Sequence, residues 1–170
     1  MKPLRIAYIS TYIPKRCGLA TYTHHLREAV MQAKAEREQA GVPAAVLPTD
    51  PVVCICHEDE TGQYTEPWQF PLVKQRREDY RKVAQHLNAS SVNVVCLQHE
   101  FGIFGGPAGE YVLDLLRHLR KPVVTTFHTV FERPDAPYTS VQREIIARSD
   151  RIHVMNRRAI EYLRSQFHIP

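Results

Sequence analysis

The segment PVVTTFHTV (residues 122–130) joins a proline, a run of β-branched residues and an aromatic residue, and it then delivers His128 and Thr129. A continuous apolar run without alternation predicts a strand that is covered on both faces, as in a parallel sheet. Ligands of open parallel sheets bind beyond the carboxyl ends of the strands. His128 therefore lies where this rule predicts a ligand. A histidine among apolar neighbours is also typical of a core residue, and the residues alone leave both interpretations open.

The bulk composition indicates one ordinary globular domain. The chain has 170 residues, of which 44% are hydrophobic and 24% charged, and its net charge is +4. This length is enough for one sizeable core and short for two. The densest basic cluster, within residues 74–82, is interrupted by Glu78 and Asp79 in a helical pattern, which favours a solvated face over a nucleic-acid site. We therefore expect no nucleic-acid partner.

Neither a targeting segment nor a metal site is expected. The first ten residues hold a short apolar run that a polar loop follows, which fits neither a signal peptide nor a membrane span. The cysteines lack the CxxC spacing of a zinc knuckle and are too few for a secreted disulfide framework, so we expect reduced thiols in a cytoplasmic protein. They are Cys17, Cys54, Cys56 and Cys96.

Apolar runs and helical periodicity alternate along the chain, which predicts an α/β fold with a Rossmann-like parallel sheet flanked by helices. Strands are expected at residues 4–10, 52–56, 92–97, 122–127 and 151–155, with residues 44–47 as a neighbour or continuation of the second. Helices are expected at residues 19–39, ended by Gly41, and at residues 73–87, 110–119, 139–148 and 157–167. Residues 57–71 are expected to be irregular because they hold acidic residues, Gly62 and Pro67.

The loop at residues 11–18 has one glycine, Gly18, at the start of the first expected helix. It matches neither GxGxxG nor the phosphate loop GxxxxGK[ST]. Free backbone N–H groups at a helix start suit an anion or a sugar hydroxyl. A glycine that merely permits a turn explains the residue equally well.

The sequence QHEFGIFGGPAG (residues 98–109) places His99 and Glu100 at the end of another expected strand and then has four glycines. The pair could hold a metal, act as general acid and base, or form a structural hydrogen bond. Adjacent strand residues point to opposite faces, which counts against both binding one metal. Near His128 there is no serine or cysteine in a nucleophile elbow.

Three features together carry a family resemblance: a first loop that ends in a glycine before a helix, a strand ending in HE, and a strand ending in TFHT. This combination resembles the N-terminal domain of family 4 glycosyltransferases of the GT-B fold, and in particular the phosphatidylinositol mannosyltransferase type. The resemblance spans the whole chain. It implies a retaining enzyme that moves a sugar from a nucleotide diphosphate donor to an acceptor hydroxyl of a sugar or glycolipid, without a metal or other cofactor.

The resemblance also implies roles for individual residues. His128 corresponds to a catalytic residue beside the donor sugar. Gly18, Leu19 and Thr129 correspond to positions near the donor phosphates and sugar. Cys17 stands where many members have a further glycine. The acceptor-side candidates are Lys15, Arg16, His99, Glu100, Gly105 and Gly106.

In that family a C-terminal domain supplies most of the donor site, so residues 1–170 are interpreted as the N-terminal, acceptor-side domain. Half a cleft provides neither preorganised positive charge for a leaving diphosphate nor exclusion of water. We therefore expect the chain alone to fold without transferring sugar, and to form a homodimer through an exposed apolar rim. The alternatives are a stand-alone α/β module that binds a ligand or partner without catalysis, and a hydrolase that uses Glu100 and His128.

Overall fold

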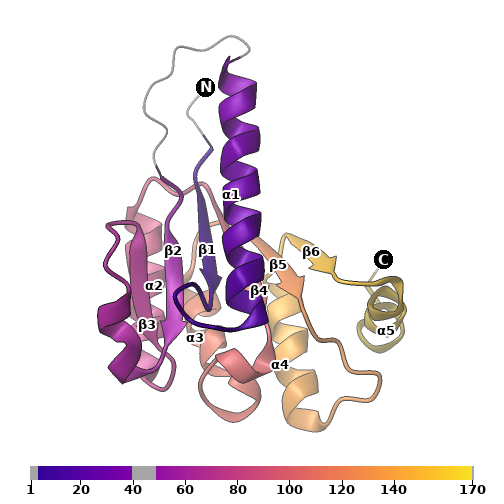
Figure 1. Cartoon of the computed structure of the whole chain (residues 1–170). Coiled ribbons are helices and arrows are strands. Elements are labelled where there is room, and N and C mark those ends of the chain that lie inside the picture. The colour runs from indigo at the N-terminus through magenta and orange to yellow at the C-terminus, as the bar shows by residue number, and fades with distance from the viewer. Residues whose placement is uncertain (1–3, 40–48, 170) are drawn as a thin grey trace.

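The computed structural model describes residues 4–39 and 49–169, and in these ranges six parallel strands form one sheet between helices (Figure 1). The strand order is β3-β2-β1-β4-β5-β6, which is the order of the doubly wound dinucleotide-binding fold. The predicted α/β Rossmann-like fold is confirmed. The strands are β1 (Ile6–Ser10), β2 (Val52–Cys56), β3 (Gln69–Val73), β4 (Val94–His99), β5 (Val123–Phe127) and β6 (Arg151–Val154).

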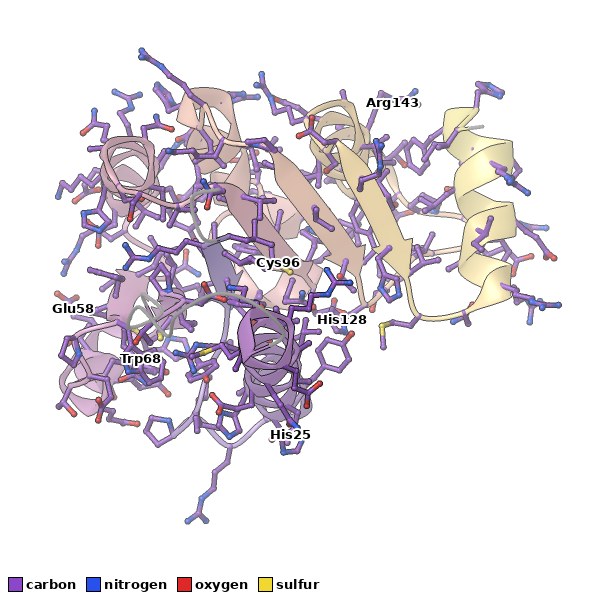
Figure 2. The ribbon with its side chains drawn as sticks, turned by 90° about the horizontal axis from the view of Figure 1, so that it is seen from above. His25, Glu58, Trp68, Cys96, His128 and Arg143 are labelled. Carbon is purple, nitrogen blue, oxygen red and sulfur yellow. The ribbon has the colours of Figure 1, made fainter. Side chains whose placement is uncertain are left out.

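The helices divide unequally between the two faces of the sheet. Right-handed crossovers put α1 (Gly18–Gln39) on one face, while α2 (Arg77–Ala89), α3 (Tyr111–His118) and α4 (Ala136–Ala147) pack on the other. The reason is that β1 to β2 runs toward one edge of the sheet, whereas β3 to β4 and β4 to β5 run toward the other. Figure 2 shows the sheet between these layers, with α5 (Arg157–Phe167) beyond β6.

The prediction for residues 57–71 is wrong in its second half. A 3-10 turn, η1 (Glu58–Gln63), is followed by β3, which pairs in register with β2 from Val52 opposite Gln69 to Cys56 opposite Val73. Pro71 is tolerated because β3 is an edge strand that needs N–H groups on one side only. Val73 therefore ends a strand, and the following helix begins at Arg77. The strand predicted at residues 44–47 and the stop at Gly41 lie outside the described residues.

The main core fills the space between the sheet and the three helices α2, α3 and α4. It joins buried side chains of these helices, such as Tyr80 and Leu115, to strand residues such as Leu97 and Phe127. The face toward α1 has a smaller cluster, made of Tyr8, Tyr12, Val52, Cys54, Cys56 and Tyr64. All four cysteines are free. The two sides of the sheet thus differ in depth of packing as well as in the number of helices.

Buried charges hold α1 in its place against the sheet. The carboxylate of Asp50 is fully buried, and it accepts hydrogen bonds from the Ile6 backbone N–H at 2.9 Å and from the Lys34 ammonium at 2.5 Å. Arg27 of α1 stacks its guanidinium over Trp68 at 3.9 Å and donates Nε–H to the Asp50 carbonyl at 3.0 Å. These contacts lie at the amino ends of the strands, and a hydrogen bond of 2.8 Å between the Ser10 and Thr23 hydroxyls holds the start of α1 at the carboxyl end of β1. None of the described helices is long and apolar enough to cross a membrane.

Candidate functional site

The loops that follow β1, β4 and β5 meet at one edge of the sheet, which we call the carboxyl edge. The order of the strands reverses between β1 and β4, since α1 leaves toward one face and α3 toward the other. Doubly wound proteins bind ligands in the crevice at this reversal. The three loops singled out in the sequence therefore lie together where a ligand site is expected.

The first loop ends in an open helix start. Cys17 caps α1, since its Sγ accepts a hydrogen bond from the Ala20 backbone N–H at 3.4 Å and contacts the Thr11 hydroxyl at 3.3 Å. A Cβ on Gly18 would meet no heavy atom within 4 Å, and Gly18 does not have a positive φ. Neither crowding nor backbone strain within the chain therefore requires this glycine. Open space in front of the helix start is what a ligand group would need for a close approach.

The cations near the first loop are already engaged in part. Lys15 forms an ion pair with Glu60 at 2.7 Å, whereas Arg16 is exposed. Lys74, which follows β3, donates to the Gly102 carbonyl at 2.7 Å. A cavity of about 100 Å³ lies between Lys15, Lys74 and the residues after β2 and β4. The Lys15 charge is thus offset within the chain, while the Lys74 ammonium is hydrogen-bonded to a neutral group.

His99 is a core residue. Its side chain is fully buried, and its ring packs against Phe101, Phe104 and Phe127 with centroid distances of 4.7, 5.6 and 5.3 Å. Neither ring nitrogen has a hydrogen-bond partner among the described residues. Burial, and to a lesser degree repulsion from His128, lowers the pKa of His99 to about 3. His99 is therefore neutral, and its side chain does not reach the surface.

The glycines after His99 serve local packing. A Cβ on Gly105 would lie 2.1 Å from the Lys74 carbonyl oxygen, and the Gly105 N–H donates to the Tyr80 hydroxyl at 3.0 Å. Gly106 has a φ of +77°, and a Cβ there would meet the Tyr111 ring at 2.6 Å. These two positions, which were predicted as acceptor-side residues, need glycine to fold the loop against α2 and α3. Their glycine character therefore gives no independent support for a ligand.

Glu100 and Thr129 join the loops after β4 and β5. The Thr129 hydroxyl donates to a Glu100 carboxylate oxygen at 2.5 Å, and both residues are half-buried. The two residues were predicted on different sides of the site, yet they are in direct contact. Together they form a polar, anionic wall beside His128.

His128 is held on the α1 side of the sheet by three contacts. Its backbone N–H donates to the His99 carbonyl at 3.0 Å, which extends the pairing of β4 and β5 by one residue. Its ring Nε2 lies 2.8 Å from the Gln98 side-chain oxygen. Tyr22 of α1 packs edge-on against the ring with a centroid distance of 5.0 Å. The side chain is half-buried, so it is both fixed and accessible (Figure 2).

The partner of Nε2 determines the protonation state that His128 presents. The side-chain nitrogen of Gln98 contacts the Cys96 sulfur at 3.1 Å and the Thr126 hydroxyl at 3.5 Å. The side-chain oxygen of Gln98 therefore faces His128, and an amide oxygen can only accept a hydrogen bond. Nε2 therefore carries the proton, and Nδ1 presents a lone pair. Burial lowers the pKa of His128, an effect that Glu100 opposes and His153 reinforces. The ring is neutral near pH 7 and can accept a hydrogen bond from a hydroxyl group.

The comparisons with known proteins add no family to this geometry. A scan against protein-family models, a search of curated proteins and a search of solved structures each return no match. Within residues 4–39 and 49–169, no group of three or more His, Cys, Asp and Glu side chains could hold a metal ion.

A polar cavity of about 240 Å³ adjoins His128 and Thr129. Its opposite wall comes from the first turns of α5 and the turn before it, through Asn156, Arg158 and Tyr162. Asn156 caps α5 by accepting a hydrogen bond from the Ala159 N–H at 2.9 Å. The cavity thus brings the loop after β5 together with a helix that the sequence analysis did not connect to the site.

Sequence reasoning missed three residues of the carboxyl edge, and it included Gln98 only as part of the acceptor-side loop QHEFGIFGG. Gln98 was detectable, since it stands next to His99 and shares a face with Thr126 and His128 by strand alternation. Tyr22, Lys74 and Arg158 gave no local signal. Their relevance depends on where α1, β3 and α5 pack, which only the tertiary structure shows.

Proposed function

We propose that this chain is the acceptor-side domain of a retaining glycosyltransferase that moves a sugar from a nucleotide diphosphate donor to an acceptor hydroxyl. The observation that carries the proposal is His128, a neutral, fixed and half-buried imidazole at the ligand-binding edge of a doubly wound sheet. The open helix start at Gly18 and the Glu100–Thr129 pair support the same site. TFHT and the upstream HE provide the family resemblance.

A neutral imidazole suits the charge that develops during glycosyl transfer. The sugar ring gains positive charge as its bond to the leaving group breaks, in an oxocarbenium-like transition state. An imidazolium ion would repel that charge, whereas the Nδ1 lone pair of neutral His128 accepts a hydrogen bond from a sugar hydroxyl. Burial of the ring favours the neutral form. We therefore assign His128 to positioning the donor sugar through a hydroxyl.

The departing diphosphate requires positive charge that the carboxyl edge supplies only in part. Lys15 is paired with Glu60, and its ammonium is therefore offset by a carboxylate. The Gly18 helix start offers backbone N–H groups and a partial positive charge. A second protein wall would have to supply the remaining cations and exclude water. This is why we expect residues 1–170 to bind substrate groups without turning them over.

The proposal is tested by donor turnover in the full-length protein that carries this chain. Uridine, guanosine and adenosine diphosphate sugars are supplied singly, and the released nucleoside diphosphate is measured with and without added acceptor alcohols. We expect one donor class to turn over, and His128→Ala to lower the rate by about 100-fold or more. His25→Ala is the matched control, since His25 is exposed on α1 outside both cavities.

The outcomes separate the alternatives. Binding of a nucleotide sugar without turnover would favour the module without catalysis. Turnover by residues 1–170 alone would overturn the requirement for a second wall, and equal rates for the His128 and His25 variants would remove His128 from the mechanism. Melting temperatures of both variants are recorded, so that a folding defect is not mistaken for a loss of chemistry.

Dimerisation of the isolated chain stays a prediction. An apolar groove lined by Ile6, Tyr8, Leu26, Val30, Val94, Cys96 and Val124 lies where α1 leaves part of the sheet open. Light scattering over a range of concentrations tests it, and a monomer throughout the range would contradict it.

A further inference from the structure

We propose that the free edge of the sheet at β6 binds an extended peptide segment of another protein, which pairs with β6 as a further strand. The segment has apolar residues on one face and acidic residues on the other. We call this surface the β6 edge. It consists of the outward backbone groups of Arg151 and His153 and of a groove lined mainly by Ile152, Val154, Ile160, Leu163 and Ile169. The groove shares no lining residue with the cavity beside His128, so the proposal goes beyond the proposed function.

The first observation is a row of backbone groups on β6 without strand partners. β6 is the last strand in the sheet order, and among the described strands β5 alone pairs with it. The Asp150 N–H donates to the Val123 carbonyl at 2.8 Å, so Asp150 and, by alternation, Ile152 turn their backbone groups toward β5. Arg151 and His153 therefore turn theirs toward the free edge. An extended peptide matches such a row in spacing and direction.

The second observation is an apolar groove of about 300 Å³ beside this row, between β6 and α5 (Figure 2). Ile152 and Val154 form its β6 wall and pack against the main core, while Ile160 and Leu163 form its α5 wall. Ile160 is 40% exposed, which leaves apolar surface open to water. A cavity of about 150 Å³ can hold a benzene molecule, so the groove has room for two apolar side chains. Because successive side chains of a strand point to opposite faces, every second residue of an added strand would enter the groove.

The third observation is positive charge on the opposite face of β6. Arg151 is paired in register with Val124, which faces the α1 side, and Arg151 and His153 are both exposed. The Arg151 guanidinium donates to the neutral Asp150 carbonyl at 2.7 Å, and it forms no ion pair within the described part of the chain. The Asp150 carboxylate is engaged on the β5 side, where it accepts the Val123 N–H at 2.8 Å. Acidic residues opposite Arg151 would therefore form favourable cross-strand pairs.

These charges favour a different protein over a second copy of this chain. Two copies joined edge to edge through β6 would bring Arg151 and His153 of one copy beside those of the other, and like charges on neighbouring strands repel. An alternating acidic and apolar segment instead matches both faces of the β6 edge. A helix or a small molecule would leave the backbone groups of the edge unpaired. The apolar groove considered above for dimerisation is a separate surface on the α1 side.

The test is an amide NMR titration of residues 1–170 with two capped peptides, GVEVEVG and GVKVKVG, at constant ionic strength. We expect the glutamate peptide to shift the amide signals of Arg151 and His153 saturably, and the lysine peptide to bind about tenfold more weakly. Arg151→Glu should weaken binding of the glutamate peptide by about tenfold and favour the lysine peptide. Ile160→Ser should weaken binding of the glutamate peptide by about fivefold, because it removes apolar surface from the groove. Arg81→Glu is the matched control, since Arg81 is exposed on α2 and does not line the groove.

N-methylation of the glutamate peptide separates strand pairing from apolar adsorption. In an extended peptide of this sequence, the valine N–H groups lie on one edge and the glutamate N–H groups on the other. Methylation on the edge that faces β6 should abolish the amide shifts, whereas methylation on the other edge should leave them unchanged.

Equal binding of the two peptides, equal effects of Arg151→Glu and Arg81→Glu, or equal binding of the two methylated peptides would overturn the proposal. The same amide shifts on raising the protein concentration without peptide would also overturn it, and would assign the β6 edge to a second copy. The proposed function fails separately. Peptide binding without donor turnover in the full-length protein would retain the β6 edge and reject the transferase, whereas turnover without peptide binding would do the reverse.

Discussion

His99 and His128 lie at the ends of two neighbouring strands, β4 and β5, yet their side chains point to opposite sides of the sheet. His99 is paired in register with Phe127 and points to the side packed by α2, α3 and α4, where three aromatic rings enclose it. His128 is one residue further and points to the side of α1, where Gln98 and Tyr22 hold it. The difference teaches that strand alternation, rather than residue type, determines which histidine of this edge can meet a ligand.

The largest effect on stability is expected in the core that surrounds His99. Phe104 is stacked on His99, its side chain is almost fully buried, and it belongs to the main core. Phe104→Ala should reduce the free energy of unfolding by about 3–5 kcal/mol, because the cavity it leaves cannot collapse fully. Urea denaturation measures the change. Phe131→Ala serves as the control, since Phe131 is partly exposed, and a similar loss in both variants would contradict the packing described for His99.

Low pH should destabilise the folded chain through His99, on the side of the sheet packed by α2, α3 and α4. The folded chain keeps His99 neutral down to about pH 3, while in the unfolded chain the group binds a proton below its ordinary pKa of 6.5. Unfolding therefore takes up a proton, and stability is lost as the pH falls from about 6.5 to about 3. Relative to wild type, His99→Leu should gain about 2 kcal/mol of stability between pH 7.5 and pH 5.

Urea midpoints at the two pH values measure this difference. His25→Leu, at an exposed histidine, should leave the pH dependence of stability unchanged. Parallel pH dependence in wild type and His99→Leu would show that His99 is hydrated or hydrogen-bonded.

A third difference between the sides concerns two buried glutamines. Gln98 accepts a hydrogen bond from His128, whereas both amide atoms of Gln142 in α4 have no partner among the described residues. Gln98→Met should reduce stability by about 1 kcal/mol and free the His128 ring to change tautomer, which imidazole nitrogen chemical shifts report. Gln142→Met should be neutral or stabilising. A larger loss of stability in Gln142→Met than in Gln98→Met would contradict this difference between the two glutamines.

The smallest effect is expected at the start of α1, on the His128 side. Cys17 caps this helix with a thiol, a weak hydrogen-bond acceptor. Cys17→Ser places a hydroxyl in the same position and should raise the free energy of unfolding by about 0.5 kcal/mol, whereas Cys17→Ala should not. Thermal unfolding of the two variants measures the difference. A destabilised serine variant would show that the thiol packs rather than caps.

The sequence predicts the buried strands of this fold better than the edge strand β3. The buried strands at Val52–Cys56 and Val123–Phe127 were predicted because uninterrupted apolar runs are a strong signal. β3 was missed because Pro67 and Pro71 interrupt the pattern, and only its place at the edge of the sheet makes Pro71 acceptable. Alternation could have placed His99 in the core. The contact of Tyr22 with His128, and the cavity that Thr129 and Arg158 both line, involve residues far apart in sequence and leave no local pattern.

The three contacts that hold His128 have a consequence for the heat and entropy of binding. A side chain that is free in solution loses about 0.5–1.5 kcal/mol of conformational entropy when a ligand immobilises it. His128 has already lost that freedom on folding, through its backbone bond to His99, its ring bond to Gln98 and its contact with Tyr22. Calorimetry should therefore show a small entropic penalty for a hydroxyl group that binds at His128.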